Sequence, residues 1–119
     1  MRELALQTQL LQLDEEPFKT LEGNDAVDLT VGRAVLEQLG RAVSESKDAL
    51  FTTFSLGLAL RKSVKTGQES ILLETVEYDH LKTVVEGNPF KFIDIIQAQL
   101  RRAIEAAPEV AVKKQSAEE

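Results

Sequence analysis

The chain has 119 residues, of which 43% are hydrophobic and 29% are charged, and its formal net charge is −6. This length predicts one domain with an ordinary hydrophobic core, and the lack of cysteine excludes disulfides, thiol nucleophiles and thiolate metal sites. The acidic balance disfavours phosphate backbones as partners. Because the sequence shows neither a signal peptide nor an apolar run of ~20 residues, we expect a cytoplasmic protein that does not contact a membrane.

The first thirty residues combine period-2 alternation with turn residues. Leucines alternate with polar residues up to Leu13, an acidic turn with proline follows at 14–17, and residues 18–21 resume an apolar pattern. This pattern predicts a β-hairpin with its turn at 14–17. Leucines at helical spacing leave residues 1–10 open as strand, helix or disordered arm. The composition of residues 22–25 predicts a turn or loop.

Two helices are predicted in the next part of the chain. The first begins at Asp28 or Thr30, which are both suitable N-caps, and runs to Val43 with an apolar stripe. The second is capped by Asp48 and ends before Gly67. Its apolar residues cover most of the circumference, so we expect it to be the central helix. One of its faces carries Leu50, Phe51, Phe54 and Leu58.

A short strand at 70–73 and two further helices are predicted in the second half. The third helix begins at residue 74 or 75 and ends at Gly87. Asn88 suits the N-cap of the fourth helix, Pro89 suits its first turn, and Pro108 closes it. Residues 108–119 are predicted to be a polar, disordered tail, which leaves residues 1–107 as one compact domain.

These elements predict an α+β fold that is mainly α. It has about four helices and a small N-terminal β-hairpin, with a short third strand as an open alternative. The predicted core consists of Val31, Val35, Leu39, Leu50, Phe54, Leu58, Tyr78, Leu81, Phe90, Ile93, Ile96 and Leu100.

Catalytic groupings are not recognisable in this sequence. His80 is the one histidine, and of the nearby carboxylates only Glu77 lies at helical contact spacing from it. One histidine and one carboxylate make an incomplete zinc site, and no glycine-rich phosphate loop or calcium-loop spacing is present. We therefore expect a non-enzymatic protein that needs no cofactor and no metal ion.

A partner-binding surface is the positive expectation, and it falls on the fourth helix. Residues 90–96 hold five large apolar side chains, and not all of them can face one small core. Phe92 and Ile95 lie off the apolar stripe of that helix, so they either widen the buried face or contact a partner or a second copy. The candidate interface residues are Phe90, Phe92 and Ile95.

A nucleic-acid-binding regulator is the alternative. Two groups of cations mark helix ends and faces, and a nucleic-acid surface would require them to converge. The candidate residues for this alternative are Arg61, Lys62, Lys65, Arg101 and Arg102.

The order of motifs resembles a set of small bacteriophage proteins of about this length. The similarity covers residues 10–107 and rests on Leu11-Gln12-Leu13-Asp14, on Leu29-Thr30-Val31-Gly32 at a helix start and on Ile71-Leu72-Leu73. In those proteins a Leu-x-Asp-Gly-x-Pro hairpin precedes a Leu-Thr-Leu-Gly helix, whereas here residues 14–17 lack the glycine. The resemblance implies a viral or prophage origin, in the host cytoplasm or the virion. The resemblance implies no chemistry. Small acidic helical proteins of phages often resemble tail-assembly chaperones, head–tail connection components or inhibitors of host proteins, which are all protein-binding roles.

Overall fold

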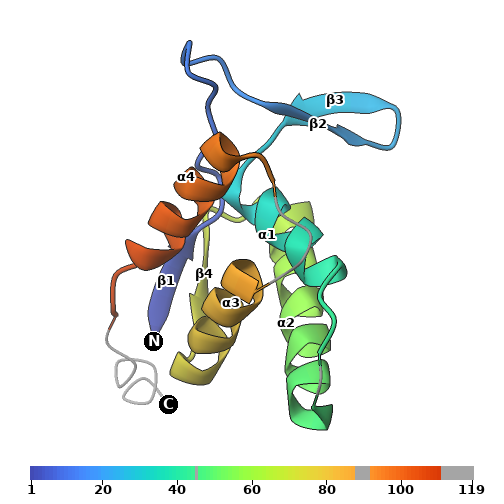
Figure 1. Cartoon of the computed structure of the whole chain (residues 1–119), viewed down its shortest axis with the longest axis vertical. Coiled ribbons are helices and arrows are strands. Elements are labelled where there is room, and N and C mark those ends of the chain that lie inside the picture. The colour runs from blue at the N-terminus through green and yellow to red at the C-terminus, as the bar shows by residue number, and fades with distance from the viewer. Residues whose placement is uncertain (45, 88–91, 111–119) are drawn as a thin grey trace.

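Four helices and two small antiparallel sheets make up the computed structural model, which describes residues 1–44, 46–87 and 92–110 (Figure 1). This confirms the predicted α+β class with helices dominant. In chain order the elements are β1 (Arg2–Ala5), β2 (Lys19–Glu22), β3 (Asp25–Asp28), α1 (Val31–Gly40), α2 (Lys47–Lys65), β4 (Ser70–Leu73), α3 (Thr75–Gly87) and α4 (Asp94–Glu105).

The first sheet joins the start of the chain to its middle. β1 pairs antiparallel with β4 in a register that sets Arg2 opposite Leu73. The residues left open at 1–10 therefore begin with a strand, and the third strand predicted at 70–73 is confirmed. On the other edge of β1, the N–H of Glu3 donates to the carbonyl of Pro108 at 3.0 Å. Residues 108–110 thus run beside β1, while residues 111–119 of the predicted tail lie outside the described residues.

The second sheet is a hairpin that extends away from the helices (Figure 1). β2 and β3 are joined by a turn at 23–24, where Gly23 has a φ of 66° that favours glycine. The turn predicted at 22–25 is confirmed. Residues 14–17 also form the predicted turn, because Leu11 and Pro17 make an antiparallel bridge and the N–H of Gln12 donates to the carbonyl of Glu16 at 2.8 Å. The prediction is wrong for the return strand, because β2 pairs with β3 rather than with the residues before the acidic turn.

Helix boundaries in the first half follow the capping residues. Thr30 caps α1, accepting the N–H of Arg33 on Oγ1 at 3.3 Å, and α1 ends at Gly40 rather than at Val43. α2 is capped by Ser46 rather than by Asp48. Its predicted end before Gly67 is confirmed, and Gly67 has a φ of 73°.

The last two helices differ in how well the sequence predicts their starts. α3 has the predicted limits. α4 begins at Asp94, with Ile93 as its N-cap, and the carbonyl of Ile93 accepts the first helical hydrogen bond, from the N–H of Gln97 at 2.9 Å. The predicted cap residues Asn88 and Pro89 lie outside the described residues. None of the helices in the described part of the chain is long and apolar enough to cross a membrane.

The core lies between the β1–β4 sheet and the four helices. The predicted core residues that are buried are Val31, Val35, Leu39, Tyr78, Leu81, Ile96 and Leu100. The prediction is wrong for Leu50, Phe54, Leu58 and Ile93, which are exposed, and Phe90 lies outside the described residues. Leucines of β1 and the following segment, together with Leu56 and Leu60 of α2, fill the interior instead.

Candidate functional site

One face of α2 is apolar and open to solvent. The exposed fractions are 51% for Leu50, 55% for Phe51, 64% for Phe54 and 50% for Leu58. Phe54 lies three residues after Phe51 and four residues from both Leu50 and Leu58, so the four side chains share one face of the helix, which we call the α2 stripe. The buried residues of the helix, including Leu56, lie on the roughly opposite side. α2 therefore has two apolar faces, and the folded chain covers only one of them.

A hollow of about 340 Å³ lies between the α2 stripe and α1. A second hollow, of about 270 Å³, continues toward the β2–β3 hairpin, where Leu21 is exposed. Both hollows are lined by Leu36 of α1 and Arg61 of α2, so they adjoin. The residues around the first hollow are Leu36, Leu39, Gly40, Leu50, Thr53, Phe54, Gly57, Leu58 and Arg61.

Two glycines flatten the surface beside the stripe. A Cβ added to Gly57 or to Gly40 would meet no atom within 4 Å, so packing inside the chain does not require a glycine at either position. Glycine in a helix interior costs about 1 kcal/mol relative to alanine. Gly57 lies between Phe54 and Leu58 on α2, so the helix backbone is accessible there to a bulky group from outside.

Three cations lie at the end of the same helix. Arg61 lines both hollows and Lys65 lines the second. Among the described residues no ion pair involves Arg61, Lys62 or Lys65. These side chains are three of the five predicted nucleic-acid residues, and two of them, Arg61 and Lys65, border an apolar groove.

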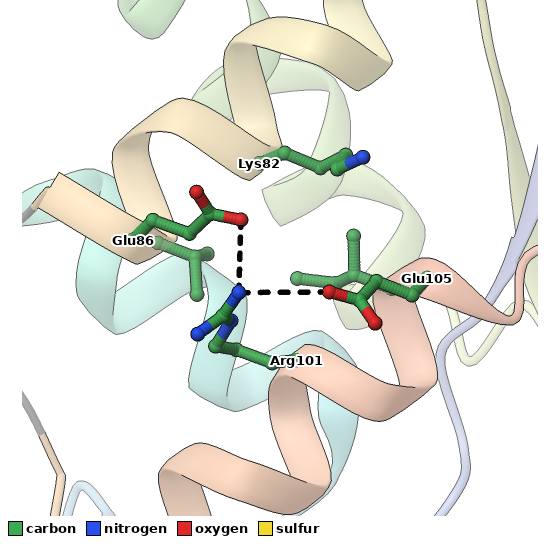
Figure 2. A pocket seen from close by; sticks show the side chains of 6 residues that line it. Lys82, Glu86, Arg101 and Glu105 are labelled. Carbon is green, nitrogen blue, oxygen red and sulfur yellow. Dashed lines mark hydrogen bonds and ion pairs between the residues drawn. The ribbon is translucent and has the colours of Figure 1, made fainter.

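The other predicted cations lie on α4, away from that groove. Arg101 is placed between two carboxylates, with Nη2 at 3.2 Å from Glu86 Oε2 and at 3.6 Å from Glu105 Oε2 (Figure 2). The hollow beside these groups measures only about 10 Å³. Arg102 lines a different hollow, between α4 and β1. The two cation groups are not brought together, and binding of nucleic acid stays a prediction.

The interface residues predicted on the fourth helix are less exposed than the α2 stripe. Phe92 is half-buried against the core, and its N–H donates to Oε1 of Gln97 at 3.2 Å. Ile95 is half-buried, and Phe90 lies outside the described residues. Sequence reasoning missed the α2 stripe because it assigned those residues to the core. The available signal was a helix with more apolar surface than one small core can cover.

His80 joins two helices. Its Nε2 lies 2.7 Å from Oγ1 of Thr53, and that hydroxyl lies 3.4 Å from Oγ of Ser44. Glu77 accepts the backbone N–H of Glu74 at 2.9 Å, so the carboxylate nearest in helical spacing is used to start α3. In the described ranges no carboxylate is hydrogen-bonded to His80, and no three His, Asp or Glu side chains are grouped to hold a metal ion. The arrangement ties α2 to α3.

Comparisons with known proteins add no relative: no family model matches the chain, and neither the curated proteins nor the solved structures contain a match. The resemblance to small phage proteins therefore stays a prediction from the motifs.

Proposed function

We propose that this chain is a non-enzymatic binding protein that docks another protein chain on the α2 stripe. The observation that carries the proposal is the exposure of two phenylalanines and two leucines on one face of α2, beside an open hollow. Roughly half of each residue is in water, which amounts to about 400 Å² of surface, within the range that often marks a functional patch.

The composition of the surface fits an interface core. Aromatic residues are enriched at the centres of protein interfaces, and charged residues are depleted there and gather at the rim. Phe51 and Phe54 lie at the middle of the stripe, while Arg61 lies at its edge. This pattern supports recognition of a protein surface rather than of a small polar ligand.

The phage resemblance supports the same class of function. An assembly factor, a virion component and an inhibitor of a host protein all act by binding a protein. Each would act in the cytoplasm of a bacterial host or within the virion.

Site-specific photo-crosslinking in producing cells tests the proposal. A photoreactive phenylalanine analogue replaces Phe51, and the matched control places it at Ala98, which is exposed on α4. We expect a covalent adduct of one discrete mass from position 51 and none from position 98. The adduct is expected to disappear in the Phe54→Asp background, with the circular-dichroism spectrum unchanged. No adduct from position 51, or the same adducts from both positions, would contradict the proposal.

A further inference from the structure

Three residues of the α2 stripe, Phe51, Phe54 and Leu58, belong to a longer row with the spacing of a helix-pairing seam. Steps of four and three residues alternate along this row, which is the average repeat of 3.5 seen where two helices pack side by side. The row covers most of α2, so its ends are roughly 27 Å apart at 1.5 Å per residue. Its members are Lys47, Phe51, Phe54, Leu58, Arg61 and Lys65.

The row is apolar in the middle and cationic at both ends. In the part of the chain that the structure describes, no ion pair involves Lys47, Arg61 or Lys65. Arg61 is the one charged residue among the described residues around the first hollow, and the acids that line the second hollow, Glu22 and Glu37, lie on β2 and α1 rather than in the row. The whole chain has a net charge of −6, so the sign of this row is opposite to that of the protein.

This charge pattern favours a partner that carries carboxylates over a second copy of the chain. If a second copy paired its own α2 with this one, the cationic ends of one row would face those of the other in either direction. Lys47 would lie near Lys65 of the other copy in an antiparallel pair and near its own equivalent in a parallel pair. Like charges across an interface disfavour association, whereas carboxylates at the same positions favour it.

The shape beside the row selects a helix as the docked element. The hollow runs between α1 and α2, and Gly57, which is half-buried and has no atom within 4 Å of an added Cβ, leaves space for a large side chain. An amphipathic helix that lies in a groove uses apolar anchors at such spacing.

We infer that the α2 stripe binds an amphipathic helix of another protein, with carboxylates flanking the apolar row of that helix at both ends. The inference rests on the proposed function, since it names the partner of the same surface. Beyond the proposed function, the inference specifies that the partner helix is acidic at both ends of its apolar row. The two acidic groups are roughly 27 Å apart in a helix that matches the length of the α2 row.

Two designed helical peptides with capped ends test this inference. Both carry the same leucine row over three heptads, and they differ only at the flanking positions, which are glutamate in one and lysine in the other. Fluorescence anisotropy of the labelled peptides is measured against the intact chain at low and high salt. We expect the glutamate peptide to bind roughly tenfold more tightly, with the difference shrinking as salt screens the charges. Non-specific attraction to a chain of charge −6 would favour the lysine peptide, so the sign of the preference is diagnostic.

A pair of charge reversals supplies the matched control. Arg61→Glu and Arg102→Glu change the net charge equally, and both side chains are exposed and free of ion pairs within the described residues. We expect Arg61→Glu to remove the preference for the glutamate peptide and Arg102→Glu to retain it. Equal binding of the two peptides, no binding of the glutamate peptide, or equal effects of the two reversals would overturn the inference.

The crosslinking result separates this inference from the proposed function. A discrete adduct from position 51 without any peptide preference leaves the proposed function standing and overturns the inference. An adduct of twice 13.2 kDa means that a second copy occupies the stripe. This result also leaves the proposed function standing and overturns the inference. Absence of both the adduct and the preference contradicts both.

Discussion

Gln38 of α1 donates a hydrogen bond from Nε2 to Oε1 of Gln97 on α4, at 2.9 Å. The same oxygen accepts the backbone N–H of Phe92 at 3.2 Å, and Nε2 of Gln97 donates to the carbonyl of Val85 at 3.2 Å. Gln38 is fully buried. The side chain of Gln97 therefore joins α1 to the end of α3 and to the segment that leads into α4.

Removal of this junction is expected to destabilise the fold. In Gln97→Ala, the buried Nε2 of Gln38 loses its acceptor on α4 and the Val85 carbonyl loses a donor. A buried polar group left without that partner costs about 1–3 kcal/mol, so we expect a loss of about 2–3 kcal/mol in the free energy of unfolding. Urea denaturation measures it, and Gln12→Ala at an exposed position is the control, with a change within ~0.5 kcal/mol. Equal effects of the two substitutions would contradict this role.

The two faces of α2 are expected to respond differently to the same substitution. Leu60 is fully buried, whereas Leu58 is half exposed. Leu60→Ala is expected to cost about 2–5 kcal/mol, and Leu58→Ala about 1 kcal/mol or less, because a cavity forms only in the first case. Both changes lie in one helix and replace the same residue type, so helix propensity cancels. Similar midpoints in urea would mean that α2 is packed on both sides.

The assignment of the wrong α2 face to the core has a physical cause. Leu50, Phe54 and Leu58 satisfy helical periodicity as well as Leu56 and Leu60 do, and periodicity alone does not say which stripe meets the other elements. The choice depends on where α1, α3 and β4 pack. Because the stripe that the structure exposes on α2 was assigned to the core, the interface was predicted on the fourth helix instead.

Elements with local sequence signals were predictable, whereas the remote partner of each strand was not. The helix stop at Gly67, the cap at Thr30 and the strand at 70–73 follow from nearby residues and are confirmed. The pairing of β1 with β4 depends on the whole path of α1 and α2 between them, so alternation in residues 1–10 did not suffice to assign a strand.

The β2–β3 hairpin is tied to α1 by one ion pair, in addition to backbone hydrogen bonds at its base and a hydrogen bond from Gln9 to Asp28. Arg33 of α1 donates to Oε2 of Glu22 from Nε at 3.0 Å and from Nη2 at 2.8 Å. Exposed pairs contribute little to global stability, so Glu22→Gln is expected to change the free energy of unfolding by less than about 1 kcal/mol. Amide hydrogen exchange in β2 and β3 is expected to accelerate several-fold, since the hairpin opens locally. Glu16→Gln is the control, and unchanged exchange in Glu22→Gln would show that the pair does not anchor the hairpin.

Replacing Gly32 or Gly57 by alanine is expected to change the free energy of unfolding in opposite directions. A Cβ at Gly32 would lie 2.9 Å from Val64 Cγ2 and 3.2 Å from the backbone oxygen of Leu6, so Gly32→Ala is expected to cost about 1–3 kcal/mol in spite of better helix propensity. A Cβ at Gly57 would meet nothing, so Gly57→Ala is expected to stabilise the chain by about 0.5–1 kcal/mol. The same methyl group would occupy the flat surface beside the α2 stripe, so Gly57→Ala is also expected to weaken the crosslink from position 51. Urea midpoints and adduct yields measured on the two variants check this, and a stabilised Gly57→Ala variant with full adduct yield would show that the partner does not approach the helix there.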